Sequence, residues 1–183
     1  MQPSRQALFA GTEAPAPHLA LDEERLAAYL RDHLDLPIAR LGIAKFRGGQ
    51  SNPTYLIDAG GRRYILRRKP PGELVASAHD IEREYRVITA LFASTVPVPR
   101  TYLYCHETDV VGSEFYIADY VEGRVFWDAG MPGVSPIERG AAYDRMNATL
   151  ANLHQVDCGM IGLGWLGRTD SYVARNLARW SRI

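Results

Sequence analysis

A run of turn-forming residues lies between two segments that favour β-strands, and it consists of Gly48, Gly49, Gln50, Ser51 and Asn52. Glycines let a backbone approach a ligand closely, and successive N–H groups in such a turn can point at anionic oxygens. A Gly-Gly pair between strands is also typical of a plain hairpin, so this glycine-rich turn alone is a weak sign of a phosphate site. The sequence matches neither GxxxxGKS/T nor GxGxxG, which excludes a P-loop and gives no support to a Rossmann dinucleotide site.

A basic β-type segment follows, in which Arg67 shares a face with Ile65 because strand side chains alternate. The planar guanidinium fork of arginine suits phosphate because it donates two parallel hydrogen bonds. Lys69 has the same parity and is the rival cation, but it directly precedes Pro70-Pro71, where the strand must end. We therefore favour Arg67 as a phosphate-binding residue. The competing interpretation is a solvated basic edge, since the neighbours of Arg67 include Arg62, Arg63 and Arg68.

The partner expected for Arg67 is a glutamate on the helix predicted over residues 81–92. Its apolar face is formed by Ile81, Tyr85, Ile88 and Phe92. Glu84 flanks that face and can reach inward, whereas Glu82, two residues away, points about 160° from Glu84 around the helix. We therefore expect Glu84 to pair with Arg67 and to fix the position of the cation. A solvated helix charge is the alternative interpretation for either glutamate.

Periodicity and turn residues indicate the elements that must position these side chains. Short strands are expected at residues 41–46, 54–58, 63–68, 100–105 and 115–120. Helices are expected at residues 22–34, 81–92 and 137–155, and from residue 172 onward. Residues 1–20 are rich in Ala and Pro without a period, so we expect a mobile arm there.

Composition excludes several classes of protein. Lys+Arg and Asp+Glu both number 21, so no basic excess argues for a nucleic-acid partner. No apolar run approaches the roughly 20 residues of a membrane span. Cys105 and Cys158 are isolated, which argues against a disulfide framework or a zinc site and is typical of a reduced compartment. The sequence predicts a cytoplasmic protein without a membrane or nucleic-acid partner.

The order of these motifs resembles the small lobe of the protein-kinase-like fold. The segments that carry the resemblance are residues 46–55, 64–72, 82–87, 96–99 and 120–123, together with Leu153-His154, residues 162–164 and Trp180. On these segments the chain resembles the aminoglycoside phosphotransferase family, and in particular the kinase-like domains related to, or fused with, some acyl-CoA dehydrogenases. The resemblance runs from about residue 40 to the last residue, and it rests on the order and spacing of the motifs together.

The resemblance implies an α+β fold in which residues 21–118 form a small lobe with an antiparallel sheet, one helix upon it and an N-terminal helix. Residues 119–124 would be the hinge, and residues 125–183 the first helices of a helical large lobe. It also implies ATP as a ligand, with the glycine-rich turn over its phosphates, Ile65 over the adenine and Arg67 at the α- and β-phosphates. The backbone C=O of Asp119 and N–H of Val121 would bind the adenine. Arginine at this strand position departs from protein kinases, which carry lysine there.

The resemblance further implies a catalytic loop, His-Gly-Asp with an Asn five residues after the Asp, and a later Asp that holds Mg²⁺ with that Asn. Of the five histidines, only His33 has an Asp two residues on, but it precedes the glycine-rich turn and Arg40 stands at the Asn position. We therefore expect no catalytic or metal residue in these 183 residues, with the Mg²⁺ ligands in a part of the large lobe outside them.

The function expected is ATP-dependent phosphotransfer to a hydroxyl of a small molecule, with this chain as the nucleotide-binding half of the enzyme. The alternative is a non-catalytic pseudokinase or an interaction module. The acceptor stays open between an antibiotic, a hydroxyacyl-CoA and another metabolite. An antibiotic kinase would favour an acidic cluster for its polycationic substrate, and the sequence contains none.

Overall fold

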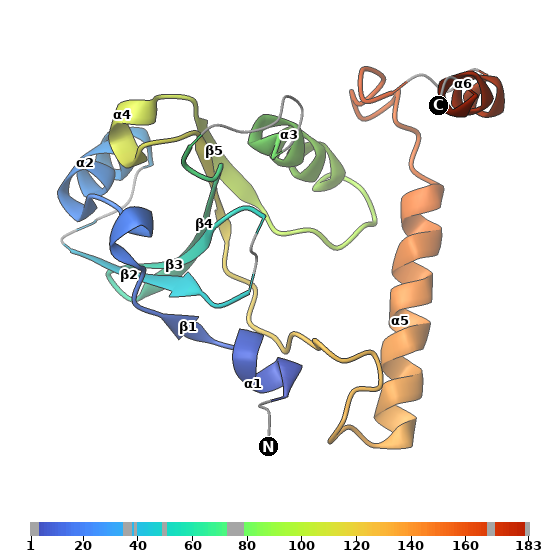
Figure 1. Ribbon diagram of the computed structural model, residues 1–183, viewed down its shortest axis with the longest axis horizontal. Coiled ribbons are helices and arrows are strands. Elements are labelled where there is room, and N and C mark those ends of the chain that lie inside the picture. The colour runs from blue at the N-terminus through green and yellow to red at the C-terminus, as the bar shows by residue number, and fades with distance from the viewer. Residues whose placement is uncertain are drawn as a thin grey trace.

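The computed structural model describes residues 4–34, 38, 40–48, 51–72, 79–167 and 171–181. A six-stranded antiparallel sheet forms its centre, with the strand order β1-β2-β3-β4-β6-β5 (Figure 1). The strands are β1 (Thr12–Glu13), β2 (Leu41–Phe46), β3 (Thr54–Ala59), β4 (Arg62–Arg68), β5 (Thr101–Cys105) and β6 (Phe115–Asp119). The helices are α1 (Arg5–Phe9), α2 (Glu23–His33), α3 (Ile81–Leu91), α4 (Thr108–Val111), α5 (Pro136–His154) and α6 (Tyr172–Trp180).

The hairpin between β3 and β4 sets the register of the central strands. Gly60 and Gly61 have φ angles of 66° and 89°, which glycine adopts without strain, and Asp58 Oδ1 accepts a 2.8 Å hydrogen bond from the Gly61 N–H. This turn pairs Tyr55 with Leu66, and it pairs Thr54 with Arg67. Successive side chains of β4 therefore point to opposite faces of the sheet.

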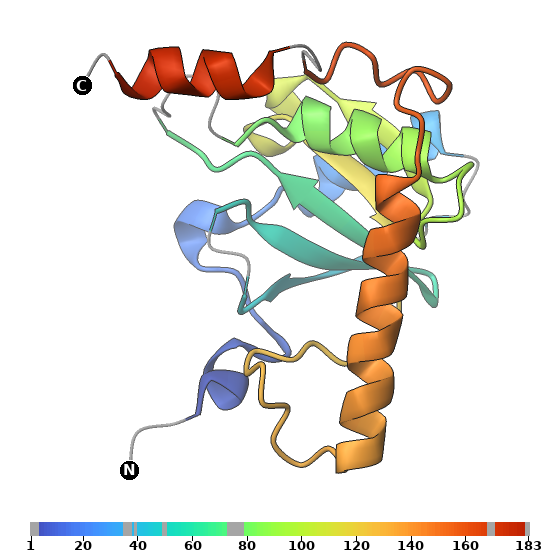
Figure 2. The same cartoon turned by 90° about the vertical axis from the view of Figure 1, so that its right-hand side faces the viewer.

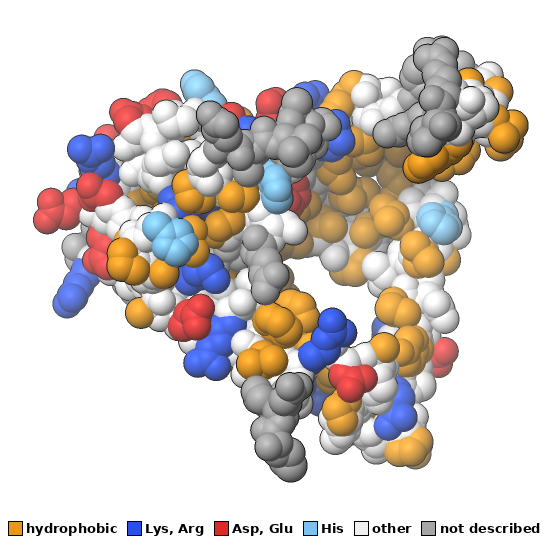
Figure 3. Space-filling view, in the orientation of Figure 1, with side chains coloured by type: hydrophobic (Ala, Val, Ile, Leu, Met, Phe, Trp, Pro, Cys, Tyr) orange, Lys and Arg blue, Asp and Glu red, His pale blue; other side chains and the backbone are white. Residues whose placement is uncertain are grey.

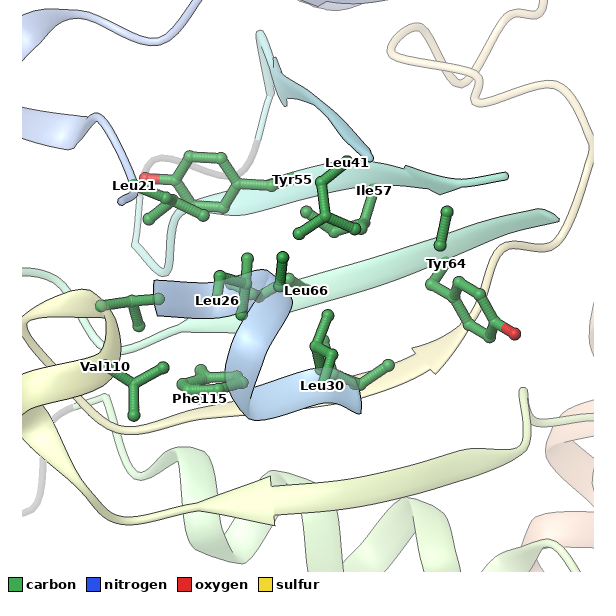
Figure 4. Close-up of a cluster of buried hydrophobic side chains, with 14 of the residues drawn as sticks. Leu21, Leu26, Leu30, Leu41, Tyr55, Ile57, Tyr64, Leu66, Val110 and Phe115 are labelled. Carbon is green, nitrogen blue, oxygen red and sulfur yellow. The ribbon is translucent and has the colours of Figure 1, made fainter. Parts of the chain in front are cut away.

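One face of the sheet is covered by α2 and α4 and contains the main hydrophobic core (Figure 4). Leu66 of β4, Phe115 of β6 and Leu26 of α2 are fully buried there. Asp22 caps α2, because its carboxylate accepts a 3.0 Å hydrogen bond from the Arg25 N–H. This face anchors β4, whose other side carries the candidate site.

The opposite face is covered only in part, by α3 lying over β5 and β6. Its core is small and consists of Ile81, Tyr116 and Ala118, with Tyr85, Ile88 and Tyr104 packed around it. Asp80 caps α3 through a 2.9 Å hydrogen bond from the Arg83 N–H. The part of this face nearest β3 carries the half-buried side chains of Thr54, Leu56, Ile65 and Arg67.

The amino-terminal residues differ from the expected mobile arm. Residues 4–20 contain α1, β1 and a 3₁₀ turn at Pro17–Leu19. Strand β1 extends the sheet by pairing Thr12 with Phe46 and Glu13 with Lys45. No periodic pattern marks these elements in the sequence, because the strand is two residues long and the helix five. Their contacts with distant segments hold them, rather than any local pattern.

Helix α5 stands beside the sheet, and none of its residues is buried (Figure 2). The large apolar side chains of α5, among them Met146 and Leu150, lie at the surface, as do the apolar residues of α6 (Figure 3). The segment after α5 returns to α3, where Leu163 is buried and the Arg86 guanidinium lies 3.9 Å from the centre of the Trp165 ring. No helix in the described part of the chain is long and apolar enough to cross a bilayer.

Candidate functional site

Arg67 lies on the α3 side of β4, between the two neighbouring strands. It is paired across the sheet with Thr54 of β3 and with Tyr116 of β6. Its Nη1 donates a 3.0 Å hydrogen bond to Thr54 Oγ1. Ile65 shares this face, as the alternation of the strand predicted, and both side chains are half-buried. The guanidinium therefore remains reachable from solvent, with 27% of the Arg67 side chain exposed.

Glu84 of α3 forms an ion pair with Arg67 across the helix–sheet interface, with 2.6 Å between Arg67 Nε and Glu84 Oε1. The Nε–H is not aimed along that line, so the contact is an ion pair rather than a hydrogen bond. The Tyr116 hydroxyl donates a 2.7 Å hydrogen bond to the same carboxylate oxygen. The pKa of Tyr116 is raised by burial first and then by this carboxylate, which keeps the phenol protonated as a donor.

Asn52 connects this ion pair to the glycine-rich turn. The side chain of Asn52 is buried, and its Nδ2 donates a 3.5 Å hydrogen bond to Glu84 Oε2. Its Oδ1 lies 2.9 Å from His79 Nδ1, and since the amide oxygen can only accept, His79 Nδ1 carries the proton. His79 directly precedes the Asp80 cap of α3 and has a φ of 62°. A cavity of about 520 Å³ lies beside this chain of contacts, lined by Ser51, Arg83 and Val87 among others.

The rival residues have other partners. Lys69 Nζ lies 3.8 Å from Glu114 Oε2, and Arg86 Nη1 lies 3.7 Å from Glu82 Oε1 on the outer side of α3. Arg68 is not part of a solvated edge, because it is buried on the opposite face and donates to the Val111 carbonyl. The ion pair predicted between Arg67 and Glu84 is therefore confirmed, while its role in nucleotide binding stays a prediction.

The predicted hinge follows β6 directly. The Tyr102 hydroxyl donates a 2.6 Å hydrogen bond to Asp119 Oδ1, and the Asp119 N–H donates a 2.8 Å hydrogen bond to the Arg100 carbonyl. Val121 is 67% exposed, and its N–H donates to no other described residue. Glu122 pairs with Arg63 of β4 at 3.3 Å. Of the residues expected in the glycine-rich turn, Gly49 and Gln50 lie outside the described residues.

A second cavity, of about 610 Å³, opens between the hinge and the glycine-rich turn. Its lining includes Phe46 and Gly48 at the end of β2, Thr54 beside Arg67, and the hinge residues Tyr120 and Gly123. The sequence did not indicate the residues on its outer side, which are Gln6, Phe9, Val125, Phe126 and Trp127. It also did not indicate Tyr116 or His79, since neither belongs to a motif and only the tertiary fold brings them to Glu84.

No group of three or more His, Cys, Asp or Glu side chains in the described ranges is placed to hold a metal ion. The cationic and amide groups around Arg67 are instead suited to an anion, because they offer N–H donors in a partly desolvated setting. This geometry favours phosphate binding next to the cavity of about 610 Å³.

Comparison with known proteins agrees with this geometry. The model of a family described as phosphotransferase enzymes matches residues 42–182. The chain belongs to this family. The sheet with α3 across it thereby has the kinase-like α+β fold that the sequence predicted, and the resemblance to aminoglycoside phosphotransferases is confirmed.

Individual relatives support the same conclusion. Acyl-CoA dehydrogenase family member 11 of Pongo abelii is 43% identical over 170 residues, covering 91% of this chain and 22% of that protein. Acyl-CoA dehydrogenase family member 10 of Mus musculus is 36% identical and is covered to 15% of its length. A crystal structure from Ralstonia eutropha JMP134, described as an aminoglycoside phosphotransferase, superimposes with a TM-score of 0.75 at 41% identity. It covers 89% of this chain, and the chain covers 47% of it.

The chain therefore spans less than a quarter of these two curated relatives and about half of the matching crystal structure.

Proposed function

We propose that the protein containing this chain transfers the γ-phosphoryl group of ATP to a hydroxyl of a small molecule, and that this chain supplies the nucleotide-binding half. The observation that carries the proposal is the Arg67–Glu84 ion pair, which is joined through Thr54 to the wall of the 610 Å³ cavity at the hinge. In kinase-like enzymes a strand cation held by a helix glutamate binds the α- and β-phosphates. Family membership supports the same reaction class.

The residues at this site fit the triphosphate. Arg67 presents a cation whose orientation is fixed by Thr54 and Glu84, and a fixed guanidinium binds phosphate with less loss of side-chain entropy than a free one. The glycine-rich turn adds backbone N–H donors above it. The Val121 N–H and the Asp119 C=O are assigned to the adenine edge, with Ile65 packing on its face. Mg²⁺ bound to the nucleotide would neutralise phosphate charge, and its protein ligands are expected in the large lobe outside these residues.

The test is the affinity for ATP in the complete protein, measured by calorimetry with two matched pairs of variants. Arg67→Ala is expected to weaken ATP binding at least tenfold, whereas Arg62→Ala, which removes an exposed contact with Tyr102, is expected to leave it unchanged. Glu84→Ala is expected to weaken binding more than Glu82→Ala, whose carboxylate pairs only with Arg86. Equal effects within each pair would assign the whole group to a solvated surface and contradict the proposal.

We further expect the 183-residue chain to show no phosphotransferase activity by itself, because it lacks the His-Gly-Asp…Asn sequence and the later Asp. Turnover of ATP with Mg²⁺ and a panel of hydroxylated metabolites is the measurement. Turnover at roughly 1 to 100 per second, the range of ordinary kinases, would mean that other residues of this chain do the chemistry. A complete protein that binds ATP and transfers no phosphate would instead support the pseudokinase alternative.

A further inference from the structure

The cavity at the hinge has an outer wall that comes from the amino-terminal segment and from the chain just after the hinge. Figures 1 and 2 both show α1 next to the segment that leaves the hinge. Gln6 joins the two with both ends of its amide: Nε2 donates to the Val125 carbonyl at 3.0 Å, and Oε1 accepts from the Trp127 N–H at 3.2 Å. The amide thus binds this backbone as a neighbouring β-strand would.

The same amino-terminal segment is also fixed to the strand that leads into the glycine-rich turn. Beyond the pairing of β1 with β2, the Arg47 N–H donates to the Gly11 carbonyl at 3.2 Å. Glu13 Oε2 lies 3.7 Å from Arg47 Nε. Residues 6–13, which include the edge strand β1, therefore connect the strand before the glycine-rich turn to the segment after the hinge.

Two aromatic rings face each other at this wall. The ring centres of Phe9 and Trp127 are 5.1 Å apart with a tilt of 43°. The Trp127 indole lies so close to Gly48 that a Cβ at that position would come within 2.3 Å of the ring. Gly48 is therefore required by the indole as well as by any ligand. The Trp127 Nε1–H is shielded from water and has no acceptor among the described residues, which is a costly state for a donor.

We propose, building on the nucleotide site proposed above, that Phe9 and Trp127 form an aromatic wall against which the nucleoside part of ATP packs. The cavity volume of about 610 Å³ is in the range of small-ligand sites. Thr54 lines the cavity and accepts from Arg67, so a ligand with its phosphates at Arg67 has its base and ribose at this wall. The wall is a binding feature that the hinge backbone alone does not supply.

The experiment separates the nucleoside from the phosphates by using two ligands, ATP and inorganic tripolyphosphate, with the complete protein. Phe9→Ala and Trp127→Ala are expected to weaken ATP binding about tenfold, since contact of a base with an aromatic ring contributes roughly 1–3 kcal/mol. Neither variant is expected to change the affinity for tripolyphosphate. Leu8→Ala is the matched control, because Leu8 is on the same helix but half-exposed and outside the cavity lining.

Three results would overturn the inference in distinguishable ways. If Arg67→Ala lowers the affinity for both ligands while Phe9→Ala and Trp127→Ala lower neither affinity, the proposed nucleotide site is supported and the proposed aromatic wall is contradicted. If Trp127→Ala tightens ATP binding, the indole blocks the site rather than lining it. If the unaltered protein binds neither ligand, the proposed function itself fails. Urea unfolding of each variant checks that a lost affinity does not reflect a lost fold, and Phe9→Leu provides a milder second variant.

Discussion

The two faces of the sheet are built for different tasks, and β4 belongs to both. Toward α2 and α4, the side chains of Tyr64, Leu66 and Arg68 are buried in the main core. Toward α3, Ile65 and Arg67 are half-buried beside a chain of polar contacts. One face excludes water and stabilises the fold, whereas the other leaves a cation and its partner within reach of a ligand. A rigid strand whose far side is locked in a core is a suitable support for a precisely oriented charge.

The largest expected effect comes from the buried face. Leu66→Ala removes a fully buried side chain from the main core and is expected to lower the free energy of unfolding by about 2–5 kcal/mol. Ile65→Ala, one residue away on the half-buried face, is expected to lower the free energy of unfolding clearly less. Urea unfolding of the two variants makes the comparison. Equal losses would mean that the two faces contribute alike to stability.

The neighbouring arginines give the next largest contrast. Arg68→Ala leaves the Val111 carbonyl without its donor and opens space beside the Tyr55 ring, so a loss of about 1–3 kcal/mol in unfolding free energy is expected. Arg67→Ala is expected to change stability by no more than about 1 kcal/mol, because its ion pair is partly exposed. ATP affinity should show the reverse order, with Arg67→Ala the more harmful. A single variant that lost both unfolding free energy and ATP affinity would contradict the separation of stability and binding between the two faces of the sheet.

A smaller effect is expected from the hydroxyl that holds Glu84. Tyr116→Phe removes one hydrogen bond to the carboxylate and keeps the ring in its buried place, so ATP affinity should fall about fivefold, or about 1 kcal/mol. Tyr104→Phe is the control, since Tyr104 packs against the same helix but its hydroxyl is beside Glu114. A role in packing alone would leave ATP affinity unchanged in Tyr116→Phe.

The smallest effect concerns the exposed start of α5. Ser135 and Glu138 form a capping box, and the hydrogen bonds from the Ser135 hydroxyl and backbone N–H hold the pKa of Glu138 below its ordinary value. A lowered pKa means that this contribution is present above the unfolded value near 4.3 and is lost as the pH falls through the folded value. The protection factors of the amide N–H groups in the first turn of α5 are expected to fall at low pH, as measured by hydrogen exchange and corrected for the intrinsic rate, and Glu138→Ala should remove that fall.

The sequence was sufficient for strands β2 to β6, for the longer helices and for the ion pair, because these depend on local patterns, but it did not indicate α1, β1 or α4. Alternation placed Arg67 beside Ile65, and the apolar face of α3 placed Glu84 toward the sheet. The hydrogen bonds made by Asn52, His79 and Tyr116 were not predictable, because the partner of a polar side chain depends on which distant segments the fold brings together. The amino-terminal wall was missed for the same reason: Gln6 and Trp127 meet across more than a hundred residues of chain, and no period marks either of them.

The tight hairpin between β3 and β4 gives the site an unusual sensitivity to chain length. Arg67 and Arg68 are consecutive residues of one chemical type on opposite faces, so a shift of one residue in the pairing of β4 would leave an arginine at the site and an arginine in the core. That shift would turn the Leu66 side chain out of the main core and toward α3, onto the face that carries the ion pair. It would also turn the side chains of Ile65 and Arg67 into the main core. The register of β4 is therefore set by its apolar residues, because Leu66 is buried in the main core while Ile65 is half-buried on the other face. Gain or loss of one residue at Gly60-Gly61 is expected to harm this protein more than most single substitutions within either strand.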